Sequence, residues 1–250
     1  MRRYLLLLVA LVFLPGCPVL EPQDTPVWQQ HLREPVTGNR FWLYKPSYHN
    51  ENRRWPLVIP LHGTHGWDNS MTQVMAWKHL AEQKGFLVAA PELRSVQGIL
   101  PVVRWLWFED LEADERRILA LIDHMVETYN VDPKAVMLTG FSAGGYPLYW
   151  TGLRNPTRFS MLVACACNSD MELFDRIEIT DEVRKLPIAI IWGKDDLKPI
   201  QDQSWDAWSF LRRNRCFDFT QRKEIPGGHR RQPQLSYALW RAYLPKKYRR

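Results

Sequence analysis

The chain has 250 residues, of which 46% are hydrophobic and 24% charged, a globular composition that excludes disordered, repeat and low-complexity classes. The formal net charge is +6, but the basic residues are scattered apart from small groups at 212–215 and 246–250, and no nucleic-acid-binding motif accompanies them. We therefore expect no nucleic-acid partner and one large core within a single domain.

The N-terminal segment has the pattern of an export signal. Arg2 and Arg3 precede an apolar run at 5–14, which is too short to span a bilayer comfortably and fits the hydrophobic part of a secretory signal. The following Leu14-Pro15-Gly16-Cys17 resembles a bacterial lipobox, in which Cys17 becomes the lipidated first residue of the mature chain. We expect residues 1–16 to be removed and Cys17 to anchor an exported lipoprotein to a membrane of the bacterial cell envelope. An ordinary signal peptide with an incidental Cys17 is the alternative.

Residues 17–35 have the composition of a linker, with four prolines and several polar residues. We expect this segment to join the lipid to a folded domain of residues 36–250.

Beyond the linker, apolar segments of strand length alternate with helical patterns. Strands that are apolar throughout are buried on both faces, which indicates a mainly parallel sheet covered by helices on each side. Only residues 168–186 separate two core strands in the second half, too few for a large cap domain. The sequence thus predicts a single-domain α/β fold, with strands at 40–44, 56–61, 86–90, 135–139, 161–167, 187–192 and 217–225, and helices at 111–127, directly after 145 and at 234–243.

Gly140-Phe141-Ser142-Ala143-Gly144 matches the pattern G-x-S-x-G, and it lies between an apolar strand and an expected helix. A sharp strand-to-helix turn strains the serine backbone, and side chains at the glycine positions would collide with neighbouring segments. We expect Ser142 to project above the sheet as a nucleophile.

A serine is a poor nucleophile at neutral pH, so it needs a histidine base that a carboxylate orients. In this kind of fold the chain order is serine, acid, histidine, and His229 is the only histidine after Ser142. Asp195 and Asp196 follow the strand at 187–192, at the sheet edge where α/β proteins build their sites. We assign the acid to Asp196, three residues after Gly193, and retain Asp195 as the alternative.

An oxyanion hole needs two preorganised backbone N–H groups. Ala143, directly after the nucleophile, is expected to supply one, and Thr64, in the loop after the strand at 56–61, the other. His62 and His65 lie in the same loop, but no cluster of carboxylates or cysteines accompanies them. We therefore expect no metal site and no cofactor.

Together these motifs resemble the polyhydroxybutyrate depolymerase and feruloyl esterase branch of the α/β-hydrolase superfamily, over most of residues 40–243. The resemblance implies the α/β-hydrolase fold and cleavage of small-molecule or polymeric carboxylic esters through an acyl-enzyme, without metal or organic cofactor. Trp105 and Trp107 are expected to border the cleft, with core packing as the alternative. A serine peptidase of the same superfamily is the main rival function, and a catalytically silent binding lipoprotein is the second. The motifs that carry the resemblance are Leu61–Gly63, Tyr129–Pro133, Gly140–Gly145, Gly193–Asp196 and Gly227–His229.

Overall fold

The computed structural model describes residues 24–96, 108–216 and 220–249. Within these residues, eight strands form one sheet in the order β1-β2-β4-β3-β5-β6-β7-β8. The β1–β2 and β2–β4 pairs are antiparallel, and every later pair is parallel. The strands are β1 (Gln30–Arg33), β2 (Arg40–Tyr44), β3 (Trp55–Leu61), β4 (Leu87–Pro91), β5 (Val131–Ser142), β6 (Met161–Cys167), β7 (Ile188–Gly193) and β8 (Thr220–Ile225).

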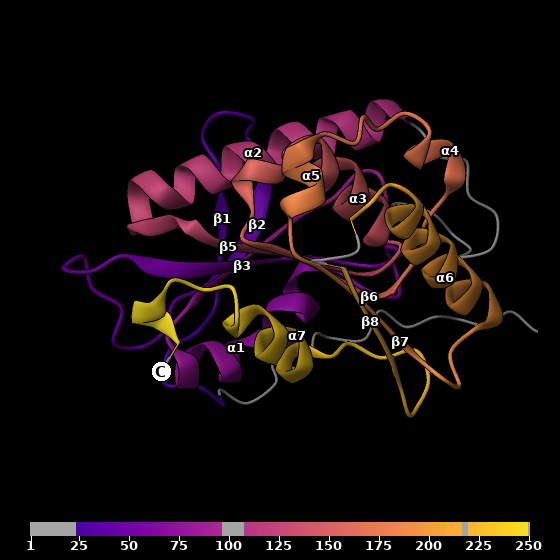
Figure 1. Cartoon of the computed structure of the whole chain (residues 1–250). Helices are drawn as coiled ribbons and strands as arrows, with labels where there is room; N and C mark the ends of the chain where they lie inside the picture. Colours follow the sequence, from indigo (N-terminus) through magenta and orange to yellow (C-terminus); the bar gives the residue numbers. More distant parts are fainter. Residues whose placement is uncertain (1–23, 97–107, 217–219, 250) are drawn as a thin grey trace, which may run out of the picture.

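Helices cover both faces of the sheet. The helices α2, α3 and α6 lie over one face, and α1 and α7 lie over the other (Figure 1). The helices are α1 (Ser70–Lys84), α2 (Phe108–Tyr129), α3 (Gly145–Arg154), α4 (Met171–Phe174), α5 (Asp181–Lys185), α6 (Lys198–Arg213) and α7 (Pro233–Arg241), with short 3-10 turns at Pro156–Arg158 and Lys246–Tyr248.

Alternation along the central strands divides the core into two layers. In β3, Leu57 and Ile59 pack in the layer with α2 and α3, whereas Val58 packs in the layer with α1 and α7, as the two-residue period of a strand requires. Every residue of β3, β4, β6 and β7 is buried. The carboxyl ends of the parallel strands therefore meet at one edge of a rigid sheet, where the loops after β3, β5 and β7 come together.

The observed architecture confirms the predicted fold class, a mostly parallel sheet with helices on both faces. Every expected strand and helix has a counterpart, although α2 is longer at both ends than the expected 111–127. The beginning of the strand expected at 217–225 lies outside the described residues, and its remainder is β8. Only the short helices α4 and α5 lie between β6 and β7, so no large cap domain is inserted there.

The start of the sheet differs from the expectation. Residues 30–33, which the sequence analysis assigned to a linker, form β1 and pair with β2. Just before this strand, Thr25 is buried, and the Asp24 carboxylate forms an ion pair with Lys78 of α1. The strand lacks an apolar pattern because it is a mostly exposed edge strand, held by backbone pairing rather than by burial.

The predicted signal peptide and Cys17 lie outside the described residues. Among the helices that the structure describes, none is long and apolar enough to cross a membrane.

Candidate active site

The turn between β5 and α3 holds Ser142 in a strained backbone conformation. Its φ angle is +53°, in the left-handed region that few residues other than glycine adopt. Two backbone hydrogen bonds fix the turn: the Gly144 amide donates to the Phe141 carbonyl at 2.9 Å, and the Asn168 amide donates to the Ser142 carbonyl at 2.8 Å. The predicted strand-turn-helix geometry around Ser142 is therefore present.

The glycines that flank Ser142 are required by close backbone packing. A Cβ atom on Gly140 would lie 2.7 Å from the carbonyl oxygen of Gly144, and one on Gly144 would lie 2.5 Å from that of Leu61. A Cβ on Gly145 would lie 2.2 Å from the carbonyl oxygen of Asn168. Side chains at these positions would push the turn away from β3 and from the segment after β6.

The structure brings Asp196 and His229 together. His229 Nδ1 lies 2.8 Å from Asp196 Oδ1, which also accepts a hydrogen bond of 2.7 Å from the Leu197 amide. Asp196 is only 6% exposed. Asp195, in contrast, is exposed, and its backbone amide donates to the carbonyl of Gly227, in the loop that carries His229. A carboxylate at Nδ1 fixes the tautomer in which Nε2 is free to act as a base.

The loop that carries His229, residues 226–232, is called here the histidine loop, and it packs on the end of β7. The Lys194 amide donates to the Ile225 carbonyl at 2.8 Å, and the Asp195 amide donates to the Gly227 carbonyl at 3.0 Å. A Cβ on Gly193 would lie 2.0 Å from the Gly227 oxygen. Gly227 itself has a φ of +100°, which favours glycine.

The histidine loop also contacts the turn at Ser142. The ring of His229 lies against that of Phe141, with centroids 4.7 Å apart and planes tilted by 37°. Because Phe141 directly precedes Ser142, this contact places the imidazole beside the turn that presents the serine.

The loop after β3, residues 62–69, is called here the oxyanion loop, and it approaches Ser142 through Gly63. A Cβ added to Gly63 would lie 3.0 Å from the Ser142 Cβ. Thr64 and Ala143 are both buried, and within the described parts of the chain neither backbone amide donates a hydrogen bond. The N–H groups of the two predicted oxyanion donors therefore have no hydrogen-bond partner among the described residues.

His62 is held inside the protein. Its Nδ1 lies 2.8 Å from the Gly63 carbonyl oxygen, and its Nε2 accepts a hydrogen bond of 3.2 Å from the Leu93 amide. Burial lowers the pKa of this imidazole, which favours the neutral form. The described residues contain no group of three or more His, Cys, Asp or Glu side chains placed to hold a metal ion.

Sequence reasoning missed two charged residues beside the site, Asp68 and Arg231. Asp68 is 4% exposed, and its carboxylate accepts a hydrogen bond from the Gly63 amide at 2.7 Å. Burial alone would raise the pKa of Asp68, but the hydrogen bonds from Gly63 and Thr72 and the charge of Arg231 outweigh it and lower the pKa from 3.8. Arg231 donates a hydrogen bond to the Asp68 carboxylate, and no local motif predicts this contact because the two residues are 163 positions apart.

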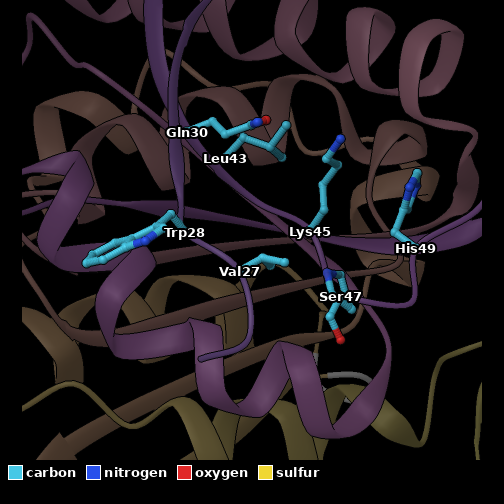
Figure 2. Close-up of a pocket in the computed structure, with 8 residues that line it drawn as sticks. Val27, Trp28, Gln30, Leu43, Lys45, Ser47 and His49 are labelled. Atoms are coloured by element: carbon cyan, nitrogen blue, oxygen red, sulfur yellow. The ribbon is translucent and has the colours of Figure 1, made fainter. Parts of the chain in front are cut away.

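Two cavities lie near the amino-terminal half of the sheet. One of about 270 Å³ lies beside β1 and β2, where Val27 and Trp28 stand opposite Lys45 and His49 (Figure 2), and none of the predicted site residues lines it. The other, of about 350 Å³, borders the oxyanion loop. Trp105 and Trp107, predicted to border the cleft, lie outside the described residues. The second cavity is lined by Trp42, His62, His65, Asn69, Ser70, Met71, Glu92 and Leu93.

Comparisons with known sequences identify hydrolases. The model of the Prolyl oligopeptidase family matches residues 69–190. The bifunctional acetylxylan esterase/xylanase XynS20E of Neocallimastix patriciarum is 29% identical over 138 residues, which are 54% of this chain and 19% of that protein. Dipeptidyl-peptidase 5 of Porphyromonas gingivalis is 25% identical over 140 residues, 53% of this chain and 20% of that protein. The chain thus spans about a fifth of the length of these relatives.

Comparisons with solved structures identify the fold. A ferulic acid esterase of Anaeromyces mucronatus in complex with ferulic acid has a TM-score of 0.66 at 16% identity, over 92% of this chain and 93% of that one. The fluorophosphonate-binding serine hydrolase F of Staphylococcus aureus has a TM-score of 0.61 at 16% identity, over 86% and 96%. The chain therefore has the α/β-hydrolase fold, and its sequence is similar both to an esterase and to a peptidase.

Proposed function

We propose that this chain is a serine hydrolase that cleaves carboxylic esters through an acyl-enzyme intermediate. The observation that carries the proposal is the 2.8 Å contact between His229 Nδ1 and the buried Asp196 carboxylate, at the same sheet edge as Ser142 in its strained turn. A nucleophile, a base and an orienting acid in these roles form the unit that activates a serine for acyl transfer.

The first half of the reaction forms the acyl-enzyme. His229 Nε2 removes the Ser142 hydroxyl proton while Oγ attacks the ester carbonyl carbon. The carbonyl oxygen becomes an oxyanion, which the uncommitted amides of Thr64 and Ala143 stabilise. When the intermediate collapses, the ester C–O bond breaks, and His229 gives its proton to the departing alcohol.

The second half releases the acid. His229 takes a proton from water, whose oxygen attacks the acyl carbon, and the second tetrahedral intermediate uses the same two amides. Collapse breaks the bond to Ser142 Oγ, which regains its proton from His229. Each proton and the oxyanion charge have a partner in this scheme, so it requires no metal or organic cofactor.

The alternative of a cysteine nucleophile has little support. Cys165 and Cys167 lie on β6 beside the Ser142 turn, but both are buried. Burial raises the pKa of Cys165 to about 12, so its reactive thiolate is scarce at neutral pH.

An ester substrate is favoured by the motif resemblance and by the sequence match, since the bifunctional acetylxylan esterase/xylanase XynS20E is 29% identical and dipeptidyl-peptidase 5 is 25% identical. Only the short helices α4 and α5 lie between β6 and β7, so this segment places no large cap over the sheet edge.

A serine peptidase is the second candidate. It is favoured by the match of residues 69–190 to the Prolyl oligopeptidase family and by the similarity to dipeptidyl-peptidase 5. Peptide amides pass through the same kind of tetrahedral intermediate. The family match includes Ser142 but ends before Asp196, so it does not extend to the acid and the base.

A substrate panel separates the two candidates. Residues 18–250, which omit the lipidated Cys17, are assayed on short-chain aryl esters, feruloyl esters, hydroxybutyrate oligomers and aminoacyl amides; they should turn over at least one ester class and should be at least about 10²-fold slower on amides. The Ser142→Ala variant should lose roughly 10⁴-fold or more of the turnover. Faster cleavage of aminoacyl amides would favour the peptidase, and turnover that survives in Ser142→Ala would refute the mechanism.

We also propose that residues 1–16 are a signal peptide and that lipid on Cys17 holds the exported catalytic domain at a membrane. The basis is the sequence alone: Arg2 and Arg3, the apolar run at 5–14 and the Gly16-Cys17 junction. A radiolabelled fatty acid should enter the wild-type protein but not Cys17→Ala. An unmodified Cys17 in mature wild-type protein that leaves the membrane in low-detergent buffer would contradict the anchor.

A further inference from the structure

An ion pair with a buried carboxylate joins the two loops of the site. Arg231, two residues after His229 in the histidine loop, donates through Nη2 to Asp68 Oδ1 in the oxyanion loop at 2.5 Å. The Asp68 side chain is 3% exposed and the Arg231 side chain 30% exposed. The pair is therefore largely shielded from water, where charge interactions are stronger than on the surface.

On the side of the oxyanion loop, Asp68 fixes the backbone that carries Thr64. Its Oδ2 accepts hydrogen bonds from the Gly63 amide at 2.7 Å and from Gln73 Nε2 at 2.6 Å. Gly63 directly precedes Thr64 and packs against Ser142, where an added Cβ would lie 3.0 Å from the Ser142 Cβ. Any movement of the Asp68 carboxylate would therefore move the Thr64 amide relative to Ser142.

The Asn69 amide at 2.8 Å and the Thr72 hydroxyl complete the set of donors to Asp68, both through Oδ1. These donors belong to the beginning of α1, so the carboxylate joins the oxyanion loop to a rigid helix as well as to the histidine loop.

On the side of the histidine loop, Arg231 contacts the turn at Ser142. Its guanidinium carbon lies 4.9 Å from the centre of the Phe141 ring, in a cation–π arrangement. The same ring contacts the imidazole of His229. Arg231 thus contacts both Asp68 in the oxyanion loop and Phe141, the residue before Ser142.

A purely stabilising role is a weak explanation for this pair. The cost of removing two charges from water often cancels the attraction between them, so buried ion pairs seldom stabilise a fold more than apolar side chains of similar size. What the pair provides is a fixed distance between the element that carries Thr64 and the element that carries His229, and catalysis depends on such distances to within about an ångström.

We propose that Asp68 and Arg231 are positioning residues that hold the Thr64 amide in register with Ser142 and His229. This inference rests on the proposed ester hydrolysis. Oxyanion contacts strengthen in the transition state, so a misplaced amide lowers kcat and leaves KM little changed. Complete removal of one oxyanion donor costs about 10²–10³ in kcat, and displacement should cost less, about 10- to 100-fold.

The test compares Asp68→Asn, Arg231→Met and Arg231→Lys in the mature chain, with active sites counted by fluorophosphonate titration. The first two variants should lose about 10- to 100-fold in kcat with KM changed by less than about threefold, and should bind a trifluoromethyl ketone, which mimics the oxyanion, more weakly by the same factor. Arg231→Lys, which keeps the charge, should recover most of the activity. The double variant Asp68→Asn/Arg231→Met should have a kcat no lower than that of the less active single variant, because the two substitutions remove the same contact.

The matched control is Asp123→Asn, which breaks the surface ion pair of Asp123 with Arg158 and should leave kcat unchanged. If Asp68→Asn fails to fold, Arg231→Met carries the test alone. An unchanged kcat in a folded variant with a lowered Tm would show that the pair has only a structural role, and it would overturn the inference. A variant whose kcat is unchanged and whose KM alone rises would overturn it too. If the wild type itself hydrolyses no ester and Ser142 does not label, the proposed function fails instead.

Discussion

Asp195 and Asp196 are adjacent in the chain but lie in different environments. Asp196 is buried against His229, whereas Asp195 is exposed and donates its backbone amide to the histidine loop. The two should not be interchangeable, since the turn after β7 directs the Asp196 carboxylate to His229 and leaves Asp195 exposed.

The Asp196→Asn variant should lose about 10⁴-fold in kcat, because an amide favours the wrong imidazole tautomer, as in the serine-protease case. Asp195→Asn should lose less than about tenfold, through altered turn hydrogen bonds alone. Steady-state kinetics measure both losses, and melting by circular dichroism verifies that both variants fold. The opposite ranking would transfer the role to Asp195, and full activity in both variants would mean that the acid lies elsewhere.

Local motifs indicate the candidate residues that lie in turns. Ser142 and His229 each lie in a short glycine-containing pattern, and Asp196 follows a strand end at a fixed distance from Gly193. Asp68 and Arg231 could not be predicted in this way, because an isolated aspartate and an arginine in a basic chain carry no local signal. Their contact depends on the folded positions of two distant loops.

At the level of elements, the buried strands were predictable and the edge strand was not. The apolar runs of β3, β6 and β7 are buried at every position, so composition alone indicates them. β1 is mostly exposed. It is held by backbone pairing with β2, which requires no apolar pattern in its sequence. The predicted linker therefore extended too far into the fold.

The contact between the end of β7 and the histidine loop predicts the effect of Gly193→Ala. A Cβ there would lie 2.0 Å from the Gly227 carbonyl oxygen, so the histidine loop must move. We expect a loss of about 10²-fold in kcat, because a displacement of about 1 Å costs that much, together with about 1–3 kcal/mol of unfolding free energy from overpacking. Enzyme assays and urea unfolding provide the two measurements.

Gly38→Ala is the matched control for that variant. Gly38 has a φ of +70° and no atom closer than 3.9 Å to an added Cβ. The left-handed conformation should cost about 1–2 kcal/mol of stability, and activity should not change because the turn between β1 and β2 is remote from Ser142. Full activity in Gly193→Ala would show that β7 does not hold the histidine loop.

For the whole molecule, the lowered pKa of Asp68 predicts that the free energy of unfolding falls at acidic pH. Its pKa in the folded protein is lowered from 3.8, so the unfolded chain takes up the proton first as the pH falls. The stabilisation is therefore complete above the ordinary pKa and is lost as the pH falls through the folded value. Urea unfolding of wild type and Asp68→Asn should show a stability difference at pH 7 that shrinks below about pH 4.

The surface variant Asp123→Asn serves as the reference in those unfolding experiments. A difference between wild type and Asp68→Asn that stays constant from pH 7 to pH 3 would mean that the charge of the carboxylate does not stabilise the fold.

The whole-molecule arrangement explains why the site forms from sequence-distant parts. Parallel strands order the loops after β3, β5 and β7 along one sheet edge (Figure 1), and the histidine loop after β8 packs back on the end of β7. Alternating apolar strands and helices were enough to predict this sheet class. The register that brings Gly63 against Ser142 depends on packing between whole strands, and local sequence does not encode it.

The most direct test of the central claim is reaction with a fluorophosphonate followed by peptide mass mapping. The wild-type protein should gain one adduct, on the peptide that contains Ser142, and esterase activity should disappear in proportion to labelling. Ser142→Ala should gain none, while Ser47→Ala, a change at an exposed serine, should label like the wild type. An adduct on a different serine, or undiminished labelling of Ser142→Ala, would contradict the assignment of Ser142 as the nucleophile.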